Sequence, residues 1–284
     1  MSAEQVQVPT RMLVEALVRP DMTVDGAELY ATGNLLGMSD QQVRLCIKRL
    51  AAEGRFVQEG RGRKAILRAS GTTEHDLGLD VEFVNHAFRQ DAGLAPWDGA
   101  WHLVAFAVPE SARTGRDALR AELTRLGGAA VQGGLYVSAN PWEPYVEDHA
   151  RRLGVAEHLT FLTSRDLRQG GHTEPAVLAA RLWPLAEIAG RYQRLAEVAR
   201  PRLQLLRDQA DLPEPRRLTI AIELAAEFTR AMEPDPLLPR ELLPRPWPGT
   251  QARALVAECL SLLARGEEDI RLFRLYRDLV VAAH

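Results

Sequence analysis

The chain has 284 residues, of which 46% are hydrophobic and 26% are charged, the balance of a globular protein with buried cores. This length suits two or three domains. The formal net charge is −3, so a basic surface for an anionic partner has to be local.

The cysteine count and the amino-terminal residues indicate the cellular compartment in which the protein works. Cys46 and Cys259 lie far apart in apolar helical patterns, so we expect neither a disulfide framework nor a zinc site. The first residues lack the basic and apolar regions of a signal peptide, and no apolar run is long enough to span a membrane. We therefore expect a cytoplasmic protein that has no membrane partner, in a reducing environment.

The amino-terminal residues have the pattern of three helices followed by a hairpin. The expected helices are 9–20, 26–36 and 40–53, and the expected strands are 55–58 and 64–68. Ser39 and Gln42 form a capping-box pattern at the start of the third helix, in which each residue can bond the other's backbone amide. This order predicts a winged helix-turn-helix.

The third helix has two chemically different sides. An apolar stripe at helical spacing is formed by Val43, Cys46, Ile47 and Leu50. The opposite side and its flanks carry Gln41, Gln42, Arg44, Leu45, Lys48 and Arg49. Amide and cationic side chains bond base edges and phosphates, and a leucine can contact a thymine methyl group. These polar residues are the expected major-groove contacts.

The hairpin that follows is strongly basic. Its cationic residues are Arg55, Arg61, Arg63, Lys64 and Arg68. Between positions 41 and 70 only two acidic residues oppose eight basic ones, a local net charge of +6. We expect Arg61, Arg63 and Lys64 at the tip to contact DNA phosphates. Basic residues on one helix usually mark only a solvated face, but a helix-turn-helix followed by a basic hairpin favours DNA binding.

The rest of the chain predicts two further domains. A connector, 71–99, carries one helical segment, 82–89. The next expected elements, in the ferredoxin-like order β-α-β-β-α-β, are 101–108, 114–126, a hairpin over 129–140, 142–153 and 158–163. Helical patterns then cover 174–206, 214–232, 249–265 and 267–283, interrupted by a proline-rich stretch, 235–249. The fold class is α+β, with domains at 1–90, 91–173 and 174–284.

Three segments resemble the PaaX family of bacterial regulators. They are Val43-Arg44 with Lys48–Phe56, the block Trp101–Asn140, and Leu182-Trp183-Pro184-Leu185 with Tyr192 and the stretch DPLLPRELLPRPWPG at 235–249. The resemblance runs from about Thr10 to about Leu263. It implies a Cas2-like central domain and a homodimeric repressor that is not an enzyme and has no resident cofactor. It further implies an inverted-repeat operator of double-stranded DNA, control of aromatic-acid (typically phenylacetate) degradation, and release by an aryl-acetyl-CoA thioester.

A CoA thioester needs cationic groups for its phosphates and an aromatic or apolar slot for its acyl part. Residues that could provide these are Trp142, Tyr145, His149 and Arg152 on one helix, and Arg181, Trp183, Arg191 and Tyr192 on the next helical segment. A cleft between these segments is one interpretation. Aromatic packing at a domain interface is the other.

Two other functions remain open from the sequence. A Cas2-like domain can be a metal-dependent nuclease, but that chemistry needs a carboxylate at the end of the first strand, and none lies between Trp101 and Pro109. The histidines show no HxxxH or HxH spacing, so no metal site is expected. The other alternative is a regulator that uses its winged helix for protein contacts, which would show no salt-dependent affinity for DNA.

Overall fold

The computed structural model describes residues 6–209, 211–264 and 272, and it leaves the side chains of 72–81 undescribed. The described chain divides into two compact units by its internal contacts. One consists of Met1–Phe88, Tyr192–Arg230 and Pro248–His284, and the other of Arg89–Arg191 and Ala231–Trp247. Each unit is a set of segments that contact one another, and it can include parts of several domains. The units therefore do not test the predicted domain boundaries near 90 and 173, which stay predictions.

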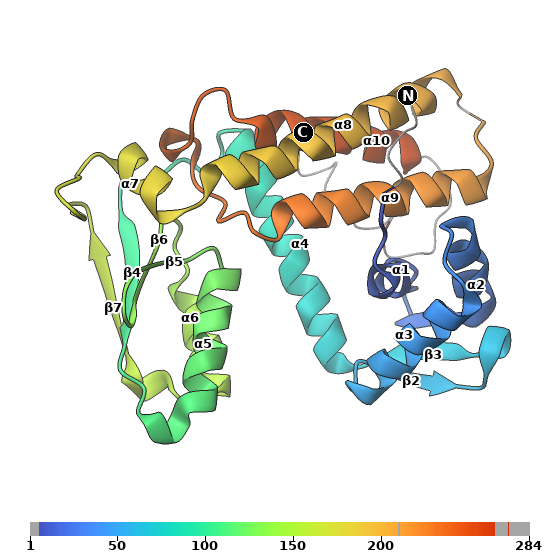
Figure 1. The fold of residues 1–284 in the computed structure, drawn as a ribbon, viewed down its shortest axis with the longest axis horizontal. Coiled ribbons are helices and arrows are strands. Elements are labelled where there is room, and N and C mark those ends of the chain that lie inside the picture. Colours follow the sequence, from blue (N-terminus) through green and yellow to red (C-terminus); the bar gives the residue numbers. More distant parts are fainter. Residues whose placement is uncertain (1–5, 210, 265–271, 273–284) are drawn as a thin grey trace. The chain divides into compact units, whose positions relative to one another are not determined.

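The first unit begins with three short helices and three short strands. They are α1 (Thr10–Ala16), β1 (Thr23–Asp25), α2 (Gly26–Leu35), α3 (Asp40–Ala52), β2 (Phe56–Glu59) and β3 (Ile66–Ala69). The strands form an antiparallel sheet in the order β1-β3-β2 (Figure 1). The three helices and the hairpin were predicted, but β1 was not, because a strand of three residues is too short to show a periodic pattern.

The second unit contains a four-stranded antiparallel sheet. Its elements are β4 (Trp101–Phe106), α5 (Arg113–Arg125), β5 (Ala129–Gln132), β6 (Leu135–Ser138), α6 (Glu143–Arg152) and β7 (Leu159–Ser164). The strand order is β5-β6-β4-β7, and both helices cover the same face (Figure 1). A core that includes Val104, Leu123 and Val146 fills the space between them. The predicted order β-α-β-β-α-β is confirmed.

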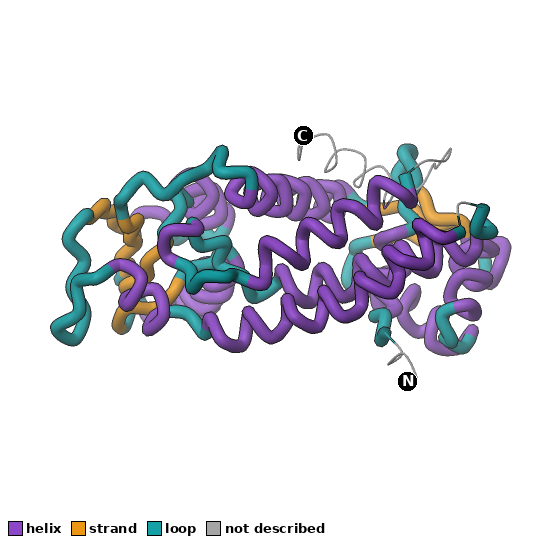
Figure 2. The backbone as a smooth tube through the Cα atoms, turned by 90° about the horizontal axis from the view of Figure 1, so that it is seen from above, coloured by secondary structure: helices purple, strands orange, loops and turns teal. Residues whose placement is uncertain are grey.

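The remaining elements are helical. They are α4 (Gly71–Asp91), α7 (Pro175–Leu182), α8 (Leu185–Asp208), α9 (Glu214–Met232) and α10 (Pro248–Leu263). Within the first unit α8, α9 and α10 lie side by side (Figure 2), joined by the ion pairs Arg202–Glu223 and Arg207–Glu258. Among the described residues, no helix combines the length and hydrophobicity needed to cross a bilayer.

Two predicted helix boundaries were wrong. The single helix predicted over 174–206 is two helices, because Trp183 is extended ahead of Pro184, as a residue before proline prefers. The connector predicted over 71–99 is mostly α4, which is much longer than the predicted segment 82–89. The helix predicted over 267–283 lies outside the described residues, except for position 272.

Candidate nucleic-acid interface

Helix α3 begins where the sequence predicts. The backbone N–H of Ser39 donates to Oε1 of Gln42 at 2.8 Å, and the N–H of Gln42 donates to Oγ of Ser39 at 3.3 Å. This reciprocal capping box satisfies amides that the helix itself cannot bond. It therefore fixes the first residue of α3 and, with it, which side chains point outward.

One side of α3 is buried against α1, α2 and β2. Val43, Ile47 and Leu50 are buried as the apolar stripe predicts, and Cys46 is half-buried. Burial raises the pKa of the Cys46 thiol, which keeps it protonated and suited to packing. Gly33 of α2 allows this close contact, since a Cβ there would lie 3.0 Å from a methyl group of Val43.

The opposite side of α3 is exposed over its whole length. Its exposed residues include Gln41, Gln42, Arg44, Leu45, Lys48 and Arg49. Leu45, in the middle of this side, is 55% exposed although it is apolar. The structure therefore brings all five predicted major-groove residues to one continuous surface around Leu45.

The hairpin β2–β3 carries the other predicted contacts. The two strands pair from Phe56↔Ala69 to Glu59↔Ile66, and a 3₁₀ turn, Gly62–Lys64, forms the tip. Gly60 has a φ of +83°, in the left-handed region that favours glycine, and lets the chain turn into the tip. Arg61, Arg63 and Lys64 are exposed there, as predicted.

Ion pairs divide the eight basic residues of this region into two groups. Arg55 lies 3.6 Å from Glu15, Arg63 lies 3.4 Å from Asp40, and Arg68 lies 3.6 Å from Glu59. In the described part of the chain, the other five basic side chains form no ion pair or hydrogen bond: Arg44, Lys48, Arg49, Arg61 and Lys64. These five cations are therefore available to an external anion.

Arg63 differs from its neighbours in a way that the sequence did not predict. Besides its ion pair with Asp40, its guanidinium lies 6.0 Å from the centre of the Tyr30 ring. Both members of the ion pair are exposed, so the pair itself contributes little to stability. Arg63 can therefore exchange Asp40 for a phosphate, whereas the half-buried Arg55 is held in place by Glu15.

The attachment of the hairpin to α2 depends on Gly26. Its N–H donates to the carbonyl oxygen of Ala65 at 2.8 Å, and a Cβ at position 26 would lie only 2.5 Å from that oxygen. We expect Gly26→Ala to destabilise the protein by about 1–3 kcal/mol, the usual cost of overpacking. Gly190→Ala is the control, since that helical glycine faces open space and alanine should add about 0.5–1 kcal/mol of stability. Urea denaturation checks both, and equal stability of the two variants would contradict the steric argument.

The residues predicted to bind an effector lie in different environments. Trp142, Trp183 and Tyr192 are buried, whereas Tyr145, Arg152 and Arg181 are exposed, and His149 and Arg191 are intermediate. The indole N–H of Trp183 donates to the carbonyl of Gly127 at 2.9 Å, and its ring stacks on Trp101 with centroids 6.3 Å apart. Trp142 lies against Gly128, the next residue along the chain from Gly127, since a Cβ at position 128 would lie only 2.4 Å from the Trp142 ring. Both tryptophans therefore pack against the turn that contains Gly127 and Gly128.

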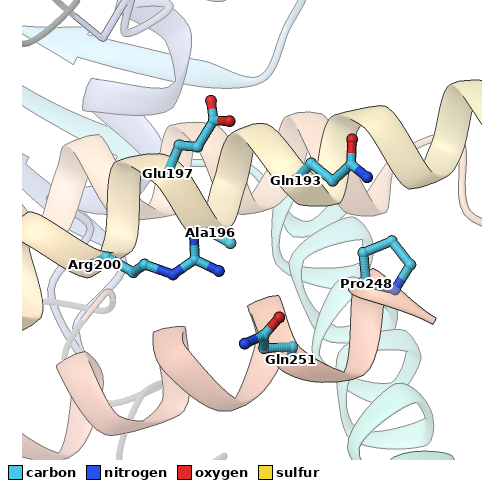
Figure 3. Close-up of a pocket in the computed structure, with 6 residues that line it drawn as sticks. All are labelled: Gln193, Ala196, Glu197, Arg200, Pro248 and Gln251. Carbon is cyan, nitrogen blue, oxygen red and sulfur yellow. The ribbon is translucent and has the colours of Figure 1, made fainter. Parts of the chain in front are cut away.

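A small hollow lies elsewhere, between α8 and α10 (Figure 3). It has a volume of about 160 Å³ and is lined by Gln193, Ala196, Glu197, Arg200, Pro248 and Gln251. None of the eight predicted effector residues lines it. Its polar lining and its size, below the roughly 300–1,000 Å³ of typical small-molecule pockets, do not suit a CoA thioester.

His102 of β4 lies in the second unit between two carboxylates. It is 8% exposed, with Nδ1 2.7 Å from Glu143 and Nε2 3.3 Å from Asp98. Among the described residues, no group of three histidine, cysteine or acidic side chains is arranged to hold a metal ion. The structure thus assigns His102 to the interior, as a link between the start of β4 and the start of α6.

Comparisons with known proteins agree with this architecture. A family model described as the PaaX protein central Cas2-like domain matches residues 94–178, and one described as the PaaX-like protein C-terminal domain matches residues 183–271. The transcriptional repressor PaaX of Escherichia coli K12 is 26% identical over 267 residues, which cover 92% of this chain and 81% of that protein. The uncharacterized protein Rv0674 of Mycobacterium tuberculosis has a similar fold, with a TM-score of 0.50 and 23% identity, over 94% of this chain and 96% of the other.

A Cas2-like domain followed by this helical domain defines a class of transcriptional regulators. Within that class, the chain belongs to the PaaX family. The matched ranges begin at residue 94, so they do not include the α3 and hairpin surface.

Proposed function

We propose that the chain is a transcriptional repressor that binds operator DNA through a winged helix-turn-helix formed by residues 10–69. The observation that carries this proposal is the surface described above, where the exposed side of α3 and the hairpin tip carry five cations that have no ion-pair partner among the residues that the structure describes. The E. coli relative's name adds support, since it is that of a transcriptional repressor.

Helix α3 would lie in the major groove. The amino-terminal part of such a helix contacts base edges, which here means Gln41, Gln42 and Arg44. Leu45 offers an apolar contact for a thymine methyl group, while Lys48 and Arg49 lie nearer the carboxyl end of α3 and complete the groove contacts. The capping box supports this role because it holds the first turn of α3 in one conformation.

The hairpin would lie over the neighbouring phosphates. Arg61 and Lys64 can contact phosphate at once, and Arg63 can do so by leaving Asp40. Phosphate contacts release condensed counterions, so they raise affinity for any sequence and make it fall with salt. The hairpin would therefore supply affinity and α3 the choice of sequence.

The proposal also includes a homodimer on an inverted repeat, control of aromatic-acid degradation, and release by an aryl-acetyl-CoA thioester. A thioester can release the protein only if it prefers a conformation that binds DNA less well. In the conformation described, the exposed cations Arg152 and Arg181 could receive its phosphates. Trp142 and Trp183 could receive its acyl group only after leaving their present packing.

The phosphate role of the hairpin is tested by Arg61→Ala. We expect this change to reduce the slope of log affinity against log salt by about one ion, because one phosphate contact is lost. Fluorescence anisotropy with duplex DNA from beside the gene, at four or five salt concentrations, measures the slope. Arg165→Ala is the control, since it removes an exposed arginine of the second unit and should leave the slope unchanged. Equal slopes for Arg61→Ala and the unaltered protein would refute the phosphate contact.

A further inference from the structure

The segment that precedes α1 is fixed to the helices of the first unit. Val6 is buried with Val198 of α8 and Ala226 of α9, and Val8 and Met12 pack against the same cluster. A short chain end without such contacts is usually mobile. Here the apolar contacts connect the beginning of α1 to Val198 and Ala226, on two helices that come much later in the sequence.

A charged group reinforces this attachment. One guanidinium nitrogen of Arg230, Nη1, bonds the carboxylate of Glu227, and the other, Nη2, donates to the backbone carbonyl of Gln7 at 2.8 Å. Glu227 is only 2% exposed, and Nε of Arg194 lies 3.4 Å from it. A buried carboxylate requires ionic or hydrogen-bonding partners, so it holds the Arg230 side chain where that side chain meets Gln7.

Helix α1 in turn contacts the residues at the end of α3. Arg11 bonds Glu15 at 3.0 Å and lies 4.0 Å from Glu53, the residue that caps α3. Glu15 also lies 3.6 Å from Arg55, which leads into β2. These contacts lead without a break from Glu227 on α9, through the segment and α1, to the helix and hairpin of the candidate interface.

We propose that Arg230, held by Glu227, is a positioning residue for DNA binding. It fixes α1 on α8 and α9 and so sets the direction in which α3 and the hairpin face. This inference rests on the proposed function. If α1 is fixed on α8 and α9, an effector that shifts these two helices also shifts the recognition surface. Effector binding would therefore act on DNA binding through α8 and α9.

Positioning has a consequence that direct DNA contact does not share. Two recognition helices of a dimer bind an inverted repeat together only if their spacing is fixed, whereas one helix binds an isolated half-site at any orientation of its attachment. Loss of the Arg230 contact should therefore weaken binding to the full inverted repeat and spare binding to a half-site.

The test compares the full-length protein with Arg230→Ala, Arg230→Lys and Arg216→Ala. Arg216 is an exposed arginine on the same helix and is the matched control. Anisotropy titrations use the inverted repeat beside the gene and a duplex that carries one half of it. We expect Arg230→Ala to reduce the affinity for the full repeat about tenfold, the size of the effect of one lost hydrogen bond to a charged group. We expect the affinity for the half-site to fall by less than about twofold. Lysine keeps the positive charge but lacks the rigid fork that places two nitrogens on the two partners, so the affinity of Arg230→Lys for the full repeat should lie between those of the unaltered protein and Arg230→Ala.

A second measurement does not depend on DNA. Hydrogen exchange of the backbone amides of α1 should become faster in Arg230→Ala and remain unchanged in Arg216→Ala, while thermal denaturation stays cooperative. Unchanged exchange, unchanged affinity for the full repeat, or an equal loss on the half-site would each overturn the positioning role. If the unaltered protein bound no DNA, the proposed function would fail, and the exchange of α1 would still decide whether Arg230 fixes this helix.

Discussion

Replacement of Trp183 by alanine is expected to destabilise the protein by about 3–5 kcal/mol, the usual cost of removing a buried tryptophan. The side chain is 6% exposed, stacks on Trp101, and donates its N–H to the carbonyl of Gly127. The change removes apolar contacts, leaves a cavity, and takes away the donor to a buried carbonyl group. Guanidinium denaturation followed by circular dichroism measures the loss.

Trp183→Phe separates these contributions. Phenylalanine keeps one aromatic ring but loses the N–H and part of the buried indole, so we expect a loss smaller than that of alanine, of which one unsatisfied buried acceptor accounts for about 1–3 kcal/mol. If Trp183→Ala left stability unchanged and abolished a response to an acyl-CoA, Trp183 would be a ligand contact and its packing role would be wrong.

Arg44→Ala is expected to weaken binding to the operator by about 1–3 kcal/mol, because Arg44 is the arginine nearest the beginning of α3 and a bidentate arginine–guanine contact contributes that much. Its side chain is exposed and, among the described residues, forms no ion pair. Competition titrations with single-base variants of the repeat should show that the mutant no longer discriminates at one position of each half-site.

Arg44→Lys is the conservative control. Lysine keeps the charge but cannot make the two parallel bonds to guanine. Compared with Arg44→Ala, Arg44→Lys should therefore restore non-specific DNA binding but little of the discrimination between bases at that position. An equal loss of affinity for specific and random duplexes would assign Arg44 to a phosphate and remove it from the base-reading residues.

The local features of the interface could be predicted from the sequence because each depends on residues close together in the chain. The capping box needs only Ser39 and Gln42, and the buried stripe of α3 needs only the helical period. The turn into the hairpin tip needs a residue such as Gly60 that tolerates a positive φ. These signals were sufficient to predict which residues of α3 and of the tip are exposed.

Partners distant in the sequence could not be predicted. Asp40 and Tyr30 hold Arg63, and Glu15 holds Arg55, yet no local pattern relates these residues. The predicted basic surface therefore contained three arginines that already have partners. The contact between Arg230 and Gln7 joins positions 223 residues apart and was likewise invisible in the sequence.

The aromatic residues near the predicted effector site show a different limit. A tryptophan that packs in a core and one that lines a ligand slot have the same local sequence properties, since both need an apolar environment. In the structure Trp142 belongs to the core between α5, α6 and the sheet, and Trp183 packs on Trp101. Only the three-dimensional packing distinguishes such residues from the exposed Tyr145.

The placement of α3 against duplex DNA is tested most directly by a photoreactive benzoylphenylalanine at position 45. Leu45 lies at the centre of the exposed side of α3 and has no packing role that the substitution would disturb, since its side chain is 55% exposed. Leu94, which is 63% exposed in the second unit, provides the matched control position. On irradiation with the duplex from beside the gene, we expect cross-links from position 45 that disappear at high salt, and none from position 94. DNA binding without any cross-link from position 45 above that control would contradict the account.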